Sequence, residues 1–390
     1  MKLIVIGLGQ CGGRIAEEFV RLNKRAQARR RIEIIPAAFA VNTDVADLSS
    51  LTLIPADYRH RILIGSRRTD GHGVGKVNEL GAEVAKEDSD LIISAIRSQG
   101  GALETDGFLV VSSAAGGTGS GAIPVVTRAI RERFIGKPVF DLIVLPFQHE
   151  ESTEERTIYN TALCLKSAST VANAVVLIDN QRYVTRDSTL QNNLSKINSL
   201  IAEPFYDLLC AGEESKPRFI GAKTLDAGDI IQTMKGWTVI GQGKAPPPKA
   251  GLFGNKLHFR HQGVRVNRVV QALEQALSEL SLDCDPKEAA TALYLLSAPT
   301  KEMRLELVKE LAAYLRTLAP EAVIRNGDYP EHRASLCVHL ILSGLRSVEK
   351  VRGYYSKSAI LVSQYSQRRE EDASRLDDME TLTKDLPSLL

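Results

Sequence analysis

Short apolar runs alternate with stretches of helical periodicity along the first half of the chain. The first run (KLIVI, 2–6) suits a strand buried on both faces. Glycines follow it, and then apolar residues three and four positions apart, which predict a helix. Further strand-like runs lie at 33–41, 107–112, 138–145 and 173–178. Apolar strands that alternate with helices predict an α/β domain with a mostly parallel sheet covered on both sides.

The second half of the chain has a different order of elements. A helical stretch spans about 188–210, and three consecutive prolines within 244–262 indicate an exposed loop or linker. Apolar residues at helical spacing from 266 to 280 predict another helix. The remaining strands and one more helix are expected at 291–297, 301–317, 321–326 and 334–343. This order predicts a second, smaller α+β domain, followed by a polar tail that is densely charged at 367–385.

Composition excludes several classes of protein. The 390 residues are 44% hydrophobic and 25% charged, with a net charge of +2, so no bulk field favours nucleic acid as a partner. The five cysteines are scattered without metal-ligand spacing, which indicates free thiols in a reducing cytosol. The uncharged stretch 107–127 is rich in Gly, Ser and Thr, unlike a membrane span, and the N-terminus lacks the features of a signal peptide. We therefore expect a cytoplasmic protein.

Two glycine-rich loops point to phosphate binding. The segment Gly7 to Gly12 (GLGQCG) matches GxGxxG between a strand and a helix, where backbone N–H groups approach a phosphate. Alone this motif is weak, because the acidic residue of a dinucleotide fold is expected about 20 positions on. The next strand ends instead at Asn42 and Asp44. The block 115–121 (AGGTGSG) again lies between a strand and a helix, and no GxxxxGK[ST] motif occurs. Two such glycine-rich loops on one sheet predict that the protein binds a nucleotide di- or triphosphate.

These loops resemble those of the tubulin/FtsZ superfamily. The block 115–121 resembles its signature glycine loop, and 9–12 (GQCG) resembles the first nucleotide loop of tubulin. The segment 71–75 (GHGVG), followed by 78–81 (NELG), is most similar to CetZ, the archaeal branch. The resemblance covers roughly 1–345. It implies a Rossmann-like GTPase domain at 1–185, a central helix at 186–218, a C-terminal α+β domain at 219–345 and a charged tail at 346–390.

The resemblance assigns roles to individual residues. The expected contacts to phosphates and part of the base are Gly9, Gln10, Cys11 and Gly12. Those near the γ-phosphate are Asn42, Asp44, Gly71, Gly73 and Gly75, with Asp44 also near a Mg²⁺ ion. The main phosphate loop comprises Ala115, Gly116, Gly117, Thr118, Gly119 and Ser120. Glu150 is implied as the ribose-binding acid and Arg156 as the family's arginine, while Asn180 and Asn198 are implied to read guanine.

The chain departs from the family pattern at three points. Leu194 replaces the aromatic residue that stacks on guanine. The loop that follows residues 146–147 is two residues longer than in FtsZ, which shifts the register of Arg156. Thr224 replaces the asparagine of the NxDxxD loop, although both of its carboxylates, Asp226 and Asp229, are kept.

Two roles are possible for Asp226 and Asp229. By spacing alone they are a cap pair at the start of a helix, where carboxylates suit the dipole. The resemblance instead implies that they act on the nucleotide of a neighbouring subunit, where a carboxylate orients the water that attacks the γ-phosphate.

The resulting hypothesis is a cytoskeletal GTPase, with GTP/GDP and Mg²⁺ as cofactors, that polymerises head-to-tail with copies of itself. A role in cell shape is favoured over division, since the tail lacks an FtsZ-type anchor motif. The tail is the candidate contact for a membrane or envelope adaptor. Two alternatives stay open: a nucleotide-binding filament protein that does not hydrolyse, and a Rossmann-type oxidoreductase.

Overall fold

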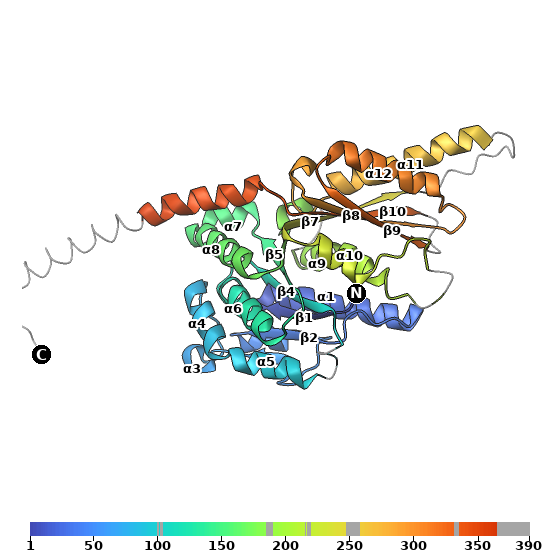
Figure 1. The fold of residues 1–390 in the computed structure, drawn as a ribbon. Helices are drawn as coiled ribbons and strands as arrows, with labels where there is room; N and C mark the ends of the chain where they lie inside the picture. Colours follow the sequence, from blue (N-terminus) through green and yellow to red (C-terminus); the bar gives the residue numbers. More distant parts are fainter. Residues whose placement is uncertain are drawn as a thin grey trace, which may run out of the picture.

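The computed structural model describes residues 1–99, 101, 104–184, 190–214, 216, 220–246, 258–330 and 335–364, without the side chains of 190–193 and 258–267 (Figure 1). Ten strands in this part of the chain form one sheet in the order β3-β2-β1-β4-β5-β6-β7-β10-β8-β9. The strands are β1 (Leu3–Leu8), β2 (Ala38–Asn42), β3 (Arg61–Leu63), β4 (Gly107–Ser113), β5 (Val139–Leu145), β6 (Ala174–Asp179), β7 (Gly236–Ala245), β8 (Thr291–Ala298), β9 (Val323–Pro330) and β10 (Leu336–Ser343).

Helices cover both faces of this sheet. They are α1 (Gly9–Arg30), α2 (Val45–Ser49), α3 (Ser66–Thr69), α4 (Asn78–Glu87), α5 (Ser89–Ser98), α6 (Thr118–Arg133), α7 (Gln148–Thr153), α8 (Glu155–Val171), α9 (Leu190–Cys210), α10 (Ala227–Thr233), α11 (His258–Ser278) and α12 (Leu305–Leu318). Two short 3₁₀ turns, η2 (Asn180–Tyr183) and η4 (Pro286–Glu288), complete the elements with assigned bounds.

Strand direction divides the sheet into two parts. From β3 to β7 every neighbouring pair is parallel, whereas β10 is antiparallel to both β7 and β8. The strands that precede α9 in the chain join those that follow it where Ala174 of β6 pairs with Gly236 of β7. The predicted mostly parallel α/β domain with a second α+β region is therefore confirmed, and the two parts share a single sheet.

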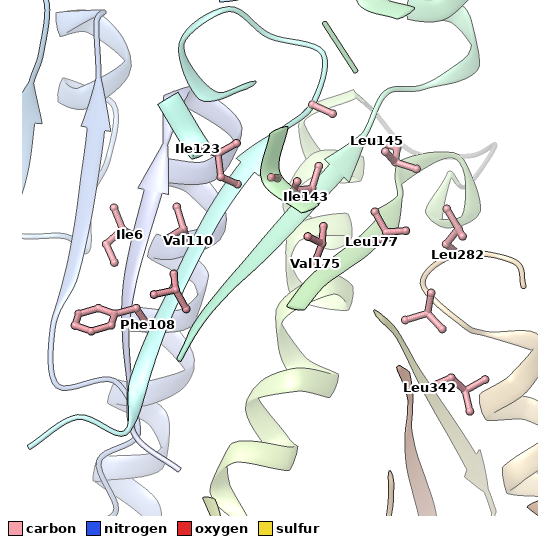
Figure 2. Packing of buried hydrophobic residues seen from close by; sticks show 14 of the residues in the cluster. Ile6, Phe108, Val110, Ile123, Ile143, Leu145, Val175, Leu177, Leu282 and Leu342 are labelled. Carbon is pink, nitrogen blue, oxygen red and sulfur yellow. The ribbon is translucent and has the colours of Figure 1, made fainter. Parts of the chain in front are cut away.

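Side chains alternate across the strands into two hydrophobic cores. In β1, Ile4 and Ile6 enter one core and Leu3 and Val5 enter the other, all with no exposed surface. Figure 2 shows the first core, where Ile6, Phe108 and Val110 line neighbouring strands and Ile123 descends on them from α6. Each such side chain contributes about 1.5–3 kcal/mol by leaving water, so the strands are fixed in register.

The start of β2 is later than the apolar pattern predicts. The run at 33–41 is apolar from Ile34 onward, yet the strand begins at Ala38. The N–H groups of Ile34 and Ile35 donate to the buried side chain of Asn23, and Pro36 has no N–H to donate. The carbonyl of Ile34 still accepts a hydrogen bond from the main-chain nitrogen of Leu3 in β1, at 3.0 Å, but the N–H groups of residues 34 and 35 are taken by Asn23, so the regular ladder starts only at Ala38.

A helix at residues 349–364 follows the last strand and packs against α7 and α8 (Figure 1). Val351, Tyr354 and Leu361 are buried there. The tail expected at 346–390 thus begins with a docked helix, and its charged stretch 367–385 lies outside the described residues. None of the helices in the described part of the chain combines the length and apolarity needed to cross a bilayer.

Candidate nucleotide-binding site

The expected phosphate loops meet at one edge of the sheet. The loops after β1, β2 and β4 leave the carboxyl ends of parallel neighbours, which is where such sheets bind ligands. Gly9 has a positive φ of 68°, and a side chain there would lie 3.2 Å from the main-chain nitrogen of Gly119. Gly12 lies one turn further, buried, where it lets α1 approach the carbonyl of Val111 in β4.

The N-terminus of α6 forms an anion cradle. The helix begins at Thr118, so the first N–H groups of the loop-to-helix turn have no intrahelical acceptor and carry partial positive charge. The hydroxyl of Ser120 donates back to the carbonyl of Gly116, which stiffens the turn. A Cβ at Gly116 would meet no atom within 4 Å, whereas one at Gly117 would lie 2.5 Å from Val74. Gly116 therefore borders open space, and Gly117 packs against the loop at 71–76.

The loop after β2 is tied to this cradle. The hydroxyls of Thr43 and Thr118 lie 2.6 Å apart. Asp47 accepts hydrogen bonds from the side chains of Gln10, at 2.7 Å, and Asn42, at 3.0 Å. Gln10 and Asn42 are thus joined through the carboxylate of Asp47, which the sequence did not single out.

Asp44 and the glycines at 71, 73 and 75 form the opposite wall. Asp44 caps α2 through one oxygen, at 3.0 Å from the nitrogen of Asp47. Its other oxygen faces Gly73, whose Cβ position would lie 3.7 Å away. All three glycines have positive φ, and Gly73 donates to the carbonyl of Thr43. The wall is shaped by backbone that only glycine adopts readily.

A Mg²⁺ ion fits this site only if phosphate oxygens supply some of its ligands. The described residues contain no cluster of three or more His, Cys, Asp or Glu side chains suited to a metal. Mg²⁺ commonly takes one or two carboxylates, several waters and the oxygens of a bound phosphate. Asp44, with one oxygen engaged in the cap and one facing the loop, offers such a ligand.

Asn160 of α8 is a site residue that the sequence did not reveal. Its buried amide nitrogen lies 2.9 Å from the carbonyl oxygen of Lys76 and within 3.2 Å of those of Ala115 and Gly116. It therefore links the loop at 71–76 to the loop at 115–121. A lone asparagine inside a helical pattern carries no motif. Arg156, one turn earlier, donates to the same Lys76 carbonyl at 3.2 Å and pairs with Glu79 of α4.

The residues that the resemblance assigns to the sugar and base come from α1, α7, η2 and α9. Cys11 and Glu150 are close enough that burial, reinforced by the Glu150 charge, raises the pKa of the Cys11 thiol to about 12. The thiol stays protonated and acts as a packing group. Glu150 holds the start of α7 by accepting from the nitrogen of Phe147 at 2.8 Å. Within the described residues the side chains of Asn180 and Asn198 make no hydrogen bond, and both are half-buried, as is Leu194.

Asp226 and Asp229 lie at the opposite edge of the sheet. Asp226 caps α10 by accepting from the nitrogen of Asp229 at 2.8 Å, as spacing predicts, and Arg325 lies 3.7 Å from the Asp229 carboxylate. Leu225 lies next to Gly212, just beyond the end of α9. That end of α9 is bonded to the chain terminus, because the Met1 amino group donates to Leu209 at 2.9 Å.

Figure 1 likewise shows α10 beside the N-terminus, where β1 begins rather than where it ends. The six residues of β1 then separate the acids from the loop at 9–12, at about 3.3 Å per residue. The carboxylates cannot reach a nucleotide bound in their own subunit.

A doubly covered, mostly parallel sheet with two glycine cradles and a distant acidic pair defines a nucleotide-binding protein of the tubulin/FtsZ type. Residues 2–185 match the Tubulin/FtsZ family, GTPase domain, and residues 187–359 match the Tubulin-like CetZ, C-terminal domain. The second match extends into the helix at 349–364.

Curated relatives agree with these matches. The chain is 33% identical to the tubulin-like protein CetZ1 of Haloferax volcanii over 371 residues, 90% of each chain. It is 28% identical to the tubulin-like protein CetZ of Pyrococcus abyssi over 381 residues, which cover 96% of this chain and 94% of that one.

Solved structures show the same likeness. The GDP-bound CetZ1 monomer of Haloferax volcanii superposes with a TM-score of 0.79 at 28% identity, covering 93% of this chain and 99% of the other. The GTPγS-bound CetZ2 protofilament of the same organism gives 0.80 at 26% identity, covering 94% and 100%. The chain belongs to the CetZ branch of the tubulin/FtsZ family of cytoskeletal GTPases, and this assignment replaces the oxidoreductase alternative.

Proposed function

We propose that this chain polymerises head-to-tail and hydrolyses GTP in a site shared by two subunits. The nucleotide loops of one subunit hold GTP. Asp44 would serve as a ligand of Mg²⁺, which would offset the negative charge of the phosphates. Asp226 and Asp229 of the next subunit complete the site. The observation that carries the proposal is the placement of cradle and acids at opposite edges of one sheet. Such a heterologous contact repeats into an open filament.

The shared site assigns each group a task. The N–H groups at the start of α6 hold the phosphates and stabilise charge that develops on them. Asp226 or Asp229 of the next subunit orients the attacking water. An isolated subunit lacks this help, because its own two acids lie at the far edge of its sheet. The relatives support this arrangement, since one is a GTPγS-bound protofilament and another a GDP-bound monomer. In this proposal residues 1–185 bind the nucleotide, the central segment 186–218 contains α9 (Leu190–Cys210), and residues 219–345 present the acids. The proposed cellular role is in shape.

The test is GTP hydrolysis as a function of protein concentration. The rate per subunit is expected to rise steeply near the assembly threshold. Asp226→Asn keeps a good helix cap while removing the carboxylate, so nucleotide affinity and folding should persist while the rate falls by about 10²–10⁴-fold.

Mixing two variants isolates the shared site. Gly116→Asp places a negative charge in open space beside the phosphates without a steric clash. Mixed with Asp226→Asn, it should restore part of the activity, because each supplies the half-site that the other lacks. A rate per subunit that stays flat with concentration, or wild-type hydrolysis by Asp226→Asn, contradicts the proposal. Filaments with GTP but without phosphate release would favour the non-hydrolysing alternative.

A further inference from the structure

The helix at residues 349–364 contacts two nucleotide-site loops at once. One is the connection from β5 to α8, which contains α7, and the other is the turn from β6 into η2. Lys350 Nζ lies 2.7 Å from the Oδ2 atom of Asp179, at the end of β6. The hydroxyl of Tyr354 donates to Oε1 of Glu151, in α7, at 2.5 Å. Lys357, on the same helix, lies 3.6 Å from the other oxygen of Glu151. Figure 1 shows the helix lying across α7 and α8.

The two loops are also bonded to each other, which closes a ring of polar contacts. Asp179 accepts from the main-chain nitrogen of Gln181 at 3.1 Å through its Oδ1 atom. The side-chain oxygen of Gln181 accepts from the main-chain nitrogen of Gln148 at 3.2 Å. Gln148 begins α7, which carries Glu151. The ring therefore runs from the C-terminal helix through both loops and back.

Each loop residue held by the helix is the chain neighbour of a nucleotide-site candidate. Glu151 follows Glu150, the implied ribose acid, and Asp179 precedes Asn180, an implied reader of guanine. A carboxylate held by the helix therefore restrains the backbone that carries its neighbour's side chain.

The side chains that make these contacts on the loops, and Tyr354 on the helix, are largely buried from solvent. Tyr354 is 2% exposed, and the side chains of Asp179 and Glu151 are 13% and 14% exposed. Burial, followed by the hydrogen bond to Glu151, raises the pKa of Tyr354, so its hydroxyl stays a donor. A cavity of about 380 Å³ borders the ring, lined among others by Leu282 and Asp283. These polar contacts add to the burial of Val351 and Tyr354 in the hydrophobic core.

We propose that the C-terminal helix positions the ribose- and base-binding loops, with Tyr354 and Lys350 as the positioning residues. Tyr354 sets Glu150 toward the ribose through Glu151, and Lys350 sets Asn180 toward guanine through Asp179. This inference rests on the proposed function, because it takes GTP as the ligand. It assigns to the start of the 346–390 segment a part in nucleotide selectivity.

The experiment measures nucleotide affinity of the full-length chain below its assembly threshold, so that polymerisation does not contribute. The probes are GTP, 2′,3′-dideoxyGTP and inosine triphosphate. Tyr354→Phe removes only the hydroxyl, and Lys350→Met removes only the charge. Tyr294→Phe is the matched control, since its buried hydroxyl donates to the carbonyl of Val308 at 2.7 Å, outside the nucleotide-site loops.

Tyr354→Phe should reduce the preference for GTP over the dideoxy analogue by about three- to tenfold. Lys350→Met should reduce the preference for GTP over inosine triphosphate by a similar factor. The control should lower thermal stability and leave both preferences unchanged. Affinities for GTP and its analogues that change in parallel, or not at all, overturn the positioning role. A wild-type chain that binds none of the three probes overturns the proposed function instead.

Discussion

The side-chain nitrogen of Asn160 lies 2.9 Å from the main-chain oxygen of Lys76. The same amide reaches Ala115 and Gly116, so one buried side chain of α8 holds the loop at 71–76 against the start of α6. The distance between the two walls of the phosphate site depends on this residue.

Replacing Asn160 should weaken nucleotide binding through the loops. Asn160→Leu leaves buried carbonyls without a donor, which costs about 1–3 kcal/mol of stability, and we expect GTP affinity to fall about tenfold. Calorimetry and thermal unfolding measure the two effects. Asn23→Leu is the control, because Asn23 is also buried and bonded to the backbone at Ile34 and Ile35. It should lose comparable stability and keep its GTP affinity; equal losses of affinity would refute the link.

Two glycines of the same loop-helix unit should respond in opposite ways. Gly116→Ala adds a methyl group to open space, so stability should hold while GTP affinity drops. Gly121→Ala places its methyl group 2.0 Å from the carbonyl oxygen of Asn78 in α4, which should cost about 1–3 kcal/mol despite alanine's higher helix propensity. Denaturant titration distinguishes them. An unfolded Gly116→Ala or a more stable Gly121→Ala would contradict the packing described.

Asp141 should make the protein less stable as pH rises. Burial raises the pKa of this carboxyl well above its ordinary value, although the Thr127 hydroxyl at 2.6 Å partly opposes the shift. The folded state therefore holds a proton that the unfolded state releases above about pH 4, so stability falls with pH, by up to about 1.4 kcal/mol per pH unit.

Asp141→Asn keeps an acceptor for Thr127 and removes the titration. Its free energy of unfolding should match the wild type near pH 3 and exceed it at pH 8. A variant less stable than the wild type at pH 8 would show that the carboxyl is charged and compensated there.

Leu194 should limit the affinity for guanine. It stands one turn before Asn198 on α9 and is half-buried, where the family pattern has an aromatic residue. Leu194→Phe should tighten GTP binding by about 0.5–1.5 kcal/mol through stacking on the base. Leu200→Phe, an exposed position on the same helix, is the control and should leave affinity unchanged. If both variants bind like the wild type, Leu194 does not face the base.

Sequence alone determined most strands of the sheet and its glycine loops, because these depend on periodicity and on glycine, whereas β3 and β7 were not among the predicted strands. Apolar runs set β4 to β6 to within a residue, and the glycine blocks located the turns where backbone meets phosphate. Asp226 was also predictable as a helix cap, since capping is a local property of spacing. The prediction failed at the start of β2, where the bonds of Asn23 to Ile34 and Ile35 override an apolar pattern.

Only the tertiary structure decided how the loops are held and where the acids lie. Asn160 and the Tyr354–Glu151 contact join segments 84 and 203 residues apart, and no spacing rule reaches that far. The separation of Asp226 from the phosphate cradle follows from the parallel pairing of β6 with β7, which places α10 at the amino edge of the sheet. Turns and helix caps depend on residues that are neighbours in the sequence. The edge of the sheet on which a group lies depends instead on strand direction, which only the tertiary structure fixes.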